Sequence, residues 1–566
     1  MRASSTPVFL TLSLLVGALG IARDAFPTKT AAHLDPAGRA LTGISGADRA
    51  HDAWVQAVVP AAKLTIGPAA GIAGDTDVKV PVELESVGGA QVSGLSLDVG
   101  YDLTRLTVAD ITIGTAAAGA DKAISWSLPG GGIVRVLVIG LNQNVIGDGD
   151  VANVIFDVLP GAAEGTSSLT LTNADTVGPD GGGVAVNSED GLFVVLWPLD
   201  TGAHDDPDVR IEYFAGWGSA SVGGAYNGTL HYSADPDASL MVAFEGTDVI
   251  VLRSKAPDKG NVGVYIDGVL NSTMANEFPG HIAFQSGHMV NGLSAGTHVL
   301  ELRNAGPGKY MDFDGLVVLE PFTPDEEVDD DHINIAYEGE WLTYSMAPLY
   351  GGGFHWTGDD AAKAQFTFTG TTVKVMRSLA PDRGQVEVYV DGAYYSTMEN
   401  YLAGALGFQS GYLITDLTNA THVVELRNAG TSVFMDLDAV VVYEPLGTGT
   451  YDDADQRIAY NRSWDVASFA GPANNTMHYS AKPDATMLVR FTGDGIRITR
   501  EVAPDRGNVD VYVDGAYRTT YSSYSAGILY QQSVDITGLG SGAHTLELRN
   551  ATPGTYMDVD TIEVLS

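Results

Sequence analysis

Short runs in which apolar and polar residues alternate cover most of the chain after residue 60. In "NVGVYIDG", Val262, Val264 and Ile266 fall on one face of an extended strand, and the "DG" that follows opens a turn. In "HVLELRN", alternation puts the apolar residues on one face and Glu301 and Arg303 together on the other, where they can pair. Such runs, separated by Gly, Pro, Asn and Asp, predict the short strands of β-sandwiches or jelly rolls.

One pattern of this kind occurs three times in the second half of the chain. "KAPDKGNVGVYIDG" at 255–268 returns as "LAPDRGQVEVYVDG" at 379–392 and as "VAPDRGNVDVYVDG" at 502–515. "HVLELRNAG" at 298–306 returns at 422–430 and 544–552 with few changes. An interval near 120 residues is too long for a solenoid repeat, so each copy should be a complete domain. We predict repeats at 205–321, 329–445 and 452–566.

The start of the chain has a different pattern from these alternating strands and repeats. One Arg precedes the apolar run "VFLTLSLLVGALG", which is typical of a secretory signal peptide and too short to span a bilayer. We predict a signal peptide at 1–22, a flexible segment at 23–60 and a separate β-sandwich at 61–198, with almost no helix after residue 25. The protein should therefore be secreted, in the extracellular space or at a cell surface.

Composition narrows the classes of partner. The chain has 566 residues, of which 45% are hydrophobic, so it can bury several cores. It has no Cys, which excludes disulfides and thiolate metal sites. The 70 acidic and 30 basic residues give a formal net charge of −40. That charge argues against nucleic acid and anionic membranes as partners, because both require basic surfaces. We expect no membrane insertion.

The region at about 61–196 carries a recognisable order of segments. "VPVELE" is followed by "GLSLDVGYDLTRLTV", "GDGDVANVIFDV", "SSLTLTNA" and a closing "DGLFVV". This order resembles cohesin domains, the nine-stranded jelly-roll sandwiches that bind dockerins in cellulose-degrading assemblies. The resemblance implies a dockerin-like protein domain as a partner. The chain has no paired "DxNxDG" calcium loops, so that partner would be another protein.

The three repeats resemble extracellular modules with the galactose-binding-like jelly-roll fold. The resemblance rests on an "IxYxGxW" opening, "RGxVxVYVDG", "HxLELRN" and a closing "MDxDxxxV". That family is generally non-catalytic and often lies beside carbohydrate-active or adhesive domains. The predicted fold class is therefore all-β: one cohesin-like sandwich followed by three homologous galactose-binding-like jelly rolls.

Each repeat closes with two Asp residues spaced two apart. These are Asp312 and Asp314, Asp436 and Asp438, and Asp558 and Asp560. On a regular strand they would share a face about 7 Å apart and repel unless neutralised. Three interpretations remain open: a calcium site built from hard oxygen ligands, an ion pair with a recurring Arg (Arg303 or Arg253), and a glycosidase-like carboxylate pair. Calcium is the one cofactor that the sequence suggests.

A Trp, a His and a charged pair in the "APDRG" turn also recur in every copy. These residues are Trp217, His231, Asp258 and Lys259, then Trp341, His355, Asp382 and Arg383, and then Trp464, His478, Asp505 and Arg506. An aromatic surface with a few polar groups is what sugar binding needs. The alternative is a buried Trp, a His satisfied in the core and a solvated turn. An aromatic residue follows each His: Tyr232, Trp356 or Tyr479.

Catalytic motifs are missing from the sequence: there is no Cys nucleophile, "GxSxG" elbow, "HExxH" helix or "GxxxxGK" loop. We predict a non-catalytic, multivalent binding or scaffold protein, with a polysaccharide or cell-surface glycan as its ligand. Three modules on short linkers would raise avidity, and the charge favours neutral or lightly charged glycans. The alternative is an accessory scaffold of polysaccharide degradation whose cohesin-like domain recruits dockerin-bearing enzymes.

Overall fold

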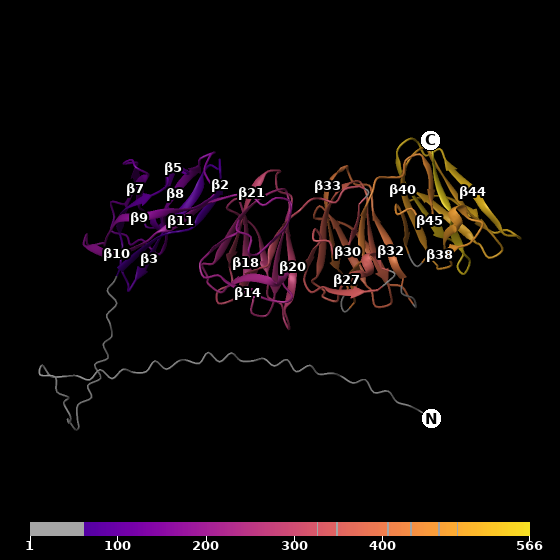
Figure 1. Cartoon of the computed structure of the whole chain (residues 1–566), viewed down its shortest axis with the longest axis horizontal. Helices are drawn as coiled ribbons and strands as arrows, with labels where there is room; N and C mark the ends of the chain where they lie inside the picture. The colour runs from indigo at the N-terminus through magenta and orange to yellow at the C-terminus, as the bar shows by residue number, and fades with distance from the viewer. Residues whose placement is uncertain are drawn as a thin grey trace, which may run out of the picture. The chain divides into compact units, whose positions relative to one another are not determined.

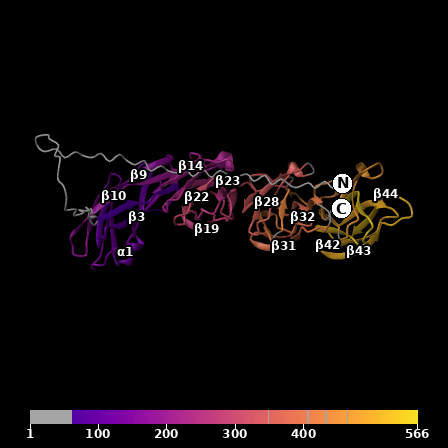
Figure 2. The same ribbon diagram turned by 90° about the horizontal axis from the view of Figure 1, so that it is seen from below.

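The computed structural model describes residues 61–566 except 325, 347–348, 404–406, 431–432, 462–463 and 484. The predicted signal peptide at 1–22 and flexible segment at 23–60 lie outside the described residues. The described part consists almost entirely of strands (Figure 1), and its one α-helix, α1 (Thr115–Gly119), is labelled in Figure 2. The predicted all-β fold class is confirmed. None of the helices in this part is long and apolar enough to cross a membrane.

The first domain is a sandwich in which the strand order runs β5-β8-β3-β1-β10-β9-β4-β7-β6, with β11 pairing β2 and β9. Its strands are β1 (Ala61–Ile66), β2 (Ala69–Ile72), β3 (Val78–Val87), β4 (Gly94–Gly100), β5 (Leu106–Ile113), β6 (Ala123–Ser127), β7 (Ile133–Ile139), β8 (Gly149–Val158), β9 (Gly165–Val177), β10 (Gly183–Glu189) and β11 (Gly191–Leu196). Alternation decides the faces: Val134, Val136 and Val138 of β7 are fully buried, and the residues between them face solvent.

The second half contains three sets of strands with one topology. Each set forms a four-stranded, a five-stranded and a three-stranded antiparallel sheet. In the first module the strands are β12 (Gly202–Asp205), β13 (Glu212–Phe214), β14 (Gly218–Ser221), β15 (Thr229–Ser233), β16 (Ser239–Glu245), β17 (Val249–Lys255), β18 (Asn261–Ile266), β19 (Val269–Ala275), β20 (Ala283–Val290), β21 (Thr297–Asn304), β22 (Met311–Phe313) and β23 (Gly315–Val318), with the 3₁₀ turn η1 (Tyr226–Gly228).

The other two modules repeat this order. Module 2 has β24 (Glu326–Asp329), β25 (Ala336–Glu338), β26 (Leu342–Ser345), η2 (Tyr350–Gly352), β27 (Gly353–Thr357), β28 (Lys363–Gly370), β29 (Val373–Leu379), β30 (Gln385–Val390), β31 (Ala393–Glu399), β32 (Gly407–Ile414), β33 (Ala420–Asn428), β34 (Met435–Leu437) and β35 (Ala439–Val442). Module 3 has β36 (Gly449–Asp452), β37 (Ile458–Asn461), β38 (Asp465–Ser468), η3 (Ala473–Asn475), β39 (Thr476–Ser480), β40 (Thr486–Thr492), β41 (Gly495–Val502), β42 (Asn508–Val513), β43 (Ala516–Ser522), β44 (Leu529–Thr537), β45 (Ala543–Asn550), β46 (Met557–Val559) and β47 (Thr561–Leu565).

The motif "HVLELRN" is the central strand β21 of its five-stranded sheet. Leu300 and Leu302 point into the core and are fully buried. On the opposite face Arg303 Nε donates to Glu301 Oε1 at 2.6 Å, so the predicted pair is confirmed. The "DG" turn between β18 and β19 has Asp267 at φ 50° and Gly268 at φ 75°, the left-handed conformations of a type I′ hairpin turn.

Apolar clusters also form where one domain meets the next. Phe214 of β13 packs against Val194 and Leu196 of the first domain. Ala336 of β25 packs against the outer face of the module 1 sheet that contains β17 and β23. Ala459 of β37 packs in the same way on module 2. Consecutive domains of residues 61–566 therefore contact one another through buried side chains.

In module 3 the outer face of the corresponding sheet, which contains β41 and β47, is charged rather than apolar. Arg497 on β41 pairs with Asp535 at 2.7 Å and with Glu563 at 3.0 Å. Charged residues stand there at the positions where module 1 has Ile250, Met289 and Val317. A polar outer face is what capping repeats present to solvent.

The core of each module should be sensitive to loss of one buried ring. Phe244 is fully buried in module 1, and the Phe244→Ala change should lower the free energy of unfolding of that module by about 3–5 kcal/mol, because it leaves a cavity. Calorimetry of the full chain should show one transition shifted to lower temperature. The control is Val209→Ala, at a side chain 78% exposed, which should shift nothing measurable. Equal effects of both changes would contradict the described core.

Candidate functional site

The recurring Trp and His are held by internal hydrogen bonds. In module 1 the His231 ring stacks on Tyr213 with centroids 4.3 Å apart, and its Nδ1 lies 2.6 Å from Asp206 Oδ2. Trp217 Nε1 donates to the carbonyls of Phe214 and Ser239 at 3.1 and 3.0 Å. Both residues therefore stabilise the fold.

The same arrangement recurs in the other modules. The rings of His355 and Tyr337 stack at 4.4 Å, and those of His478 and Tyr460 at 4.1 Å. The indole nitrogens of Trp341 and Trp464 also donate to backbone carbonyls. Of the two interpretations offered for these residues, the structure favours the packed and satisfied one. Their role as sugar contacts stays a prediction.

The charged pair of the "APDRG" turn is divided between surface and interior. Asp258 is exposed, whereas Lys259 is only 9% exposed and its Nζ lies 2.6 Å from Asp312 Oδ2. Asp312 also accepts hydrogen bonds from the backbone N and the hydroxyl of Ser254 at the end of β17. The cation predicted to touch a ligand is therefore the counter-ion of the buried aspartate.

The ion pair predicted for this aspartate is present, but its partner is neither of the two arginines proposed from the sequence. Arg303 is engaged with Glu301, and Arg253 with Glu338. The equivalent pairs in the later modules are Arg383 with Asp436 and Arg506 with Asp558. Asp382 and Asp505, in the same turns, are 59% and 61% exposed along their side chains, and each accepts from its neighbouring Arg at 2.9 Å. Only the acidic half of the turn is available to a ligand.

The second aspartate of each pair lies in a different environment. The chain leaves the three-stranded sheet after Phe313, so Asp312 and Asp314 do not lie on one regular strand. Asp314 Oδ1 accepts from the backbone N of Tyr226 at 2.8 Å, and its buried Oδ2 has no hydrogen-bond partner among the described residues. Burial, with Asp312 and other carboxylates nearby, raises the pKa of Asp314 to about 8.

Asp438 and Asp560 repeat this arrangement. Each accepts a backbone hydrogen bond through one oxygen, and burial raises their pKa values to about 7 and about 6. Among the described residues, no three His, Asp or Glu side chains are grouped in a way that could hold a metal ion. Calcium binding at these aspartates stays a prediction.

An aromatic pair lies beside each buried ion pair, and it is exposed in module 1 and partly buried in modules 2 and 3. Tyr232 and Tyr310 have ring centroids 6.1 Å apart, Trp356 and Phe434 5.2 Å, and Tyr479 and Tyr556 5.7 Å. The first ring of each pair follows the recurring His, and the second immediately precedes the closing "MD". Sequence reasoning did not single out the second ring, although an aromatic residue stands there in every copy. These pairs recur in all three modules, and an aromatic ring can stack against the apolar face of a sugar.

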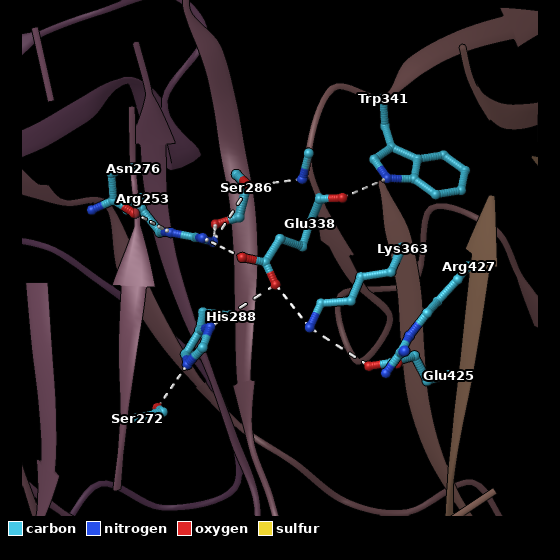
Figure 3. Close-up of polar contacts among 11 residues, drawn as sticks. Arg253, Ser272, Asn276, Ser286, His288, Glu338, Trp341, Lys363, Glu425 and Arg427 are labelled. Atoms are coloured by element: carbon cyan, nitrogen blue, oxygen red, sulfur yellow. Dashed lines mark hydrogen bonds and ion pairs between the residues drawn. The ribbon is translucent and has the colours of Figure 1, made fainter. Parts of the chain in front are cut away.

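The junction of modules 1 and 2 contains a buried group of charges (Figure 3). Arg253 is fully buried, and its Nη2 donates to Glu338 Oε1 of the next module at 2.8 Å. Its Nε donates to Asn276, and its Nη1 donates to the carbonyl of Ser286. The other carboxylate oxygen of Glu338 lies 3.0 Å from Lys363 Nζ.

Glu338 is held in its charged form by this surrounding. Burial alone would raise the pKa of Glu338, but His288, Arg253 and Lys363 lower it far below the ordinary carboxyl value. At the next junction Arg377 donates to Asn461 Oδ1 at 3.1 Å, so a neutral amide takes the place of the carboxylate. The residue at this position is thus different at each junction: Phe214, Glu338 or Asn461.

The first domain offers a separate surface on the sheet that contains β4, β7 and β9. Leu137 and Ile139 of β7 point outward and are 37% and 48% exposed. A Cβ placed on Gly94 would lie 3.2 Å from Val177 and 3.4 Å from Ile139, so these two side chains line one row across the sheet. Beside this apolar row Arg135 makes a two-bond ion pair with a buried aspartate of β4. Exposed apolar residues gathered on a sheet are typical of a protein-binding surface.

Comparison with known families identifies this first domain. The family model of the Cohesin domain matches residues 62–191, so this part of the chain is a cohesin domain and the predicted resemblance is confirmed. Similar solved structures include a non-cellulosomal cohesin from Archaeoglobus fulgidus, 23% identical, covering 24% of this chain and 92% of that chain with a TM-score of 0.21. Another is a cohesin–dockerin complex from Clostridium thermocellum, 16% identical, covering 24% and 95%, with a TM-score of 0.23.

Two curated proteins of Flavonifractor plautii are also similar to this chain. "A type blood alpha-D-galactosamine galactosaminidase" is 24% identical over 363 residues, which cover 62% of this chain and 33% of the relative. "A type blood N-acetyl-alpha-D-galactosamine deacetylase" is 31% identical over 110 residues, which cover 19% of this chain and 14% of the relative. The matches thus span a third or less of each relative's length.

The raised pKa of Asp314 makes the stability of module 1 depend on pH. A carboxyl whose pKa is raised in the folded state stabilises the protein at low pH, and this stability is lost as the pH rises through about 8. The Asp314→Asn variant should therefore have a higher Tm than the unmodified protein at pH 9 and a similar Tm near pH 4. Thermal unfolding across that range measures the difference.

The addition of calcium tests whether Asp314 is a calcium ligand or only a buried carboxyl of the fold. If Asp314 is a calcium ligand, calcium chloride should raise the Tm of the unmodified protein at pH 8 and leave Asp314→Asn unchanged. An equal response of both proteins would exclude Asp314 from a calcium site.

Glu338 should be required for docking of modules 1 and 2. The Glu338→Gln change leaves Arg253 buried without its counter-charge, which should weaken docking by about 2–5 kcal/mol. Small-angle scattering of the full chain should then report a larger radius of gyration. Glu85→Gln is the control, because its carboxylate is 63% exposed in a surface pair that contributes little. An unchanged scattering curve for Glu338→Gln would show that apolar contacts suffice.

Proposed function

We propose that the protein is an extracellular binding and scaffold protein that joins a dockerin-bearing partner to a glycan. The observation that carries the proposal is the combination of a cohesin domain at 62–191 with three modules, each carrying an aromatic pair that is exposed or partly exposed. The cohesin domain supplies the protein-binding end, and the modules supply the carbohydrate-binding end. Secretion accords with the apolar run near the start of the sequence.

The proposed dockerin surface is the outer face of the sheet containing β4, β7 and β9. Its exposed Leu137 and Ile139 would bury apolar area on binding, and Arg135 beside them would give the contact polar specificity. The solved cohesin of Clostridium thermocellum was crystallised in complex with a dockerin, which supports this class of partner.

The proposed glycan surface is the set of aromatic pairs. Two relatives named for different reactions, a galactosaminidase and a deacetylase, both match this chain and both names refer to the A-type blood sugar. The longer match exceeds the cohesin domain in length and therefore includes module sequence. Similarity to two relatives named for different reactions is better explained by a common glycan than by a common catalytic site. We therefore propose that the modules bind a glycan and do not catalyse its breakdown.

A second candidate function follows from the same relatives. If the dockerin-bearing partner is itself a glycan-degrading enzyme, the protein would hold that enzyme on its substrate. The contacts between modules fix the spacing of the three aromatic pairs, so multivalent binding would require matched spacing in the glycan.

The cohesin surface can be tested with purified dockerin domains of the type found in the Clostridium thermocellum complex. The unmodified chain should bind, and Leu137→Asp should weaken binding at least tenfold, because it places a charge within the apolar row. Val209→Asp, at an exposed apolar residue of module 1, is the control and should bind normally. If no dockerin in a broad panel binds, the dockerin half of the proposal is wrong.

The glycan surface can be tested on an array of neutral and lightly charged glycans. Single replacements of Tyr232, Trp356 and Tyr479 by Ala should each lower retention, and the triple replacement should lower it by more than the product of the single effects, since avidity is lost. Leu103→Ala, a change at an exposed residue of the cohesin domain, is the control. Equal retention of the triple variant and the unmodified chain would exclude these rings as the binding surface.

A further inference from the structure

A pocket of about 350 Å³ lies where module 2 meets module 3. Module 2 contributes residues of β24, β29 and β32, and module 3 contributes residues of β37, β38 and β39 and of the segment that precedes β37. The volume is near the lower end of the roughly 300–1,000 Å³ that small-molecule sites have. The pocket is therefore large enough for one sugar ring but not for an oligosaccharide.

The recurring Trp and His of module 3 both line this pocket. The His478 ring stacks on Tyr460, and its Nδ1 lies 2.7 Å from Asp453 Oδ2. A carboxylate can only accept, so Nδ1 carries the proton and Nε2 of the neutral ring is an acceptor. Among the described residues this Nε2 has no hydrogen-bond partner, and the side chain is 18% exposed. The contacts that hold the ring therefore leave its second nitrogen for a hydroxyl donor.

Module 2 contributes a hydroxyl that also lacks a partner. Ser410 of β32 lines the pocket and is 4% exposed, and its Oγ makes no hydrogen bond to the described residues. A buried hydroxyl without a partner is costly, so a ligand that bonds to it is favoured. The two polar groups without partners thus come from different modules and line one pocket.

The preceding junction has a smaller version of this pocket. Trp341 and His355 line a pocket of about 230 Å³ together with residues of module 1. There Ser286, which stands at the position of Ser410 in the repeat, accepts from the backbone N of Gly339 at 3.3 Å. Of these two junctions, only the second combines the larger volume with an unpaired hydroxyl.

Each carboxylate of the lining is already paired within the protein. Asp453 accepts from the imidazole described above, and Asp455 forms an ion pair with Arg457 at 2.7 Å. Glu327 accepts from the side-chain amide of Gln456. The carboxylates therefore do not call for a cationic ligand.

The positive charge in the lining is compensated as well. Lys374 is the one Lys or Arg among the described lining residues, and its Nζ donates to the backbone carbonyl of Gln456. Burial lowers the pKa of Lys374 to about 8, against the attraction of Glu327 and Asp455. Because no charge in the pocket is left over, a ligand is recognised there by hydrogen bonds and apolar contact.

The remaining lining supplies the apolar contact. It includes Trp464, Phe408, Met376 and Val466, the last of which is 54% exposed. Aromatic and aliphatic side chains beside a few hydrogen-bonding groups match a sugar, which has a C–H face and a set of hydroxyls.

We propose that the pocket between modules 2 and 3 binds one uncharged sugar residue. One sugar hydroxyl donates to His478 Nε2, another bonds to Ser410 Oγ, and the C–H face of the ring lies against the apolar lining. The inference rests on the proposed glycan-binding function and adds to the aromatic pairs a second class of site. This site exists only where modules 2 and 3 are docked, because both contribute to it.

The test is methyl NMR spectroscopy of the full chain with labelled methionine. The methyl group of Met376, assigned with the Met376→Leu variant, lies in the lining and reports on this pocket. Galactose or N-acetylgalactosamine should shift its signal until the site is saturated. Galactosamine and galacturonic acid should bind about tenfold more weakly, because their charge would enter the pocket without a partner.

Two variants test the polar contacts. Ser410→Ala should weaken sugar binding about three- to tenfold and leave the Tm unchanged, because Oγ has no internal partner to lose. His478→Asn keeps an amide that can donate to Asp453 but lacks Nε2, and it should weaken binding to a similar extent. The matched control is His231→Asn in module 1, whose ring has the same internal contacts and which should leave the Met376 response unchanged.

The outcomes separate this inference from the glycan function. If no sugar shifts the Met376 signal while the array still retains the chain, the inference is wrong and the glycan function stands. Equal or tighter binding of the charged sugars would also overturn it, as would unchanged binding by both Ser410→Ala and His478→Asn. No response at Met376 together with no retention on the array would overturn both.

Discussion

Each module depends on one buried carboxylate, Asp312 in module 1, that joins two of its sheets. The residue lies on the three-stranded sheet, accepts from the backbone of the four-stranded sheet and neutralises the cation of the "APDRG" turn. A buried charge without a partner would cost several kcal/mol, so the aspartate and its cation must occur together. That cation also lies 5.8 Å from the Tyr310 ring at the surface. One set of atoms therefore supports both the interior of the module and its outward aromatic pair.

The parts of the fold that follow local rules could be predicted from the sequence. Alternation placed Leu300 and Leu302 in the core and Glu301 beside Arg303, because side-chain direction in a strand depends only on neighbouring residues. The cohesin domain was recognised from the order of its segments. The partner of Asp312 was missed, because Lys259 lies in a turn whose charges looked solvated.

The contacts between consecutive domains could not be predicted either, because they also depend on residues far apart in the sequence. Phe214, Glu338 and Asn461 occupy one position in the repeat, and compared with one another they look like unconstrained variation. Each of these residues instead matches the neighbouring domain that it contacts. Phe214 packs on apolar residues of the cohesin domain, Glu338 pairs with Arg253, and Asn461 accepts from Arg377. Similarity among the copies reports the core that they share, whereas the differences among them report which surface each one meets. A comparison of the copies within one chain therefore reveals their shared core, but it does not reveal which surface each copy contacts.

This matching bears on how the repeats persist in a genome. Tandem copies of similar sequence can recombine unequally, which deletes or adds whole units. Deletion of module 2 would place Asn461 against Arg253 and would bring a strand built to meet Met376 and Leu413 onto Ile250 and Met289. Each junction thus disfavours replacement of either of the two modules that form it. On the outer face of module 3, Arg497 lies between two carboxylates, and this charged face disfavours the packing of a duplicate module against it. The order of the repeats is protected by the chemistry of the surfaces at which the domains meet.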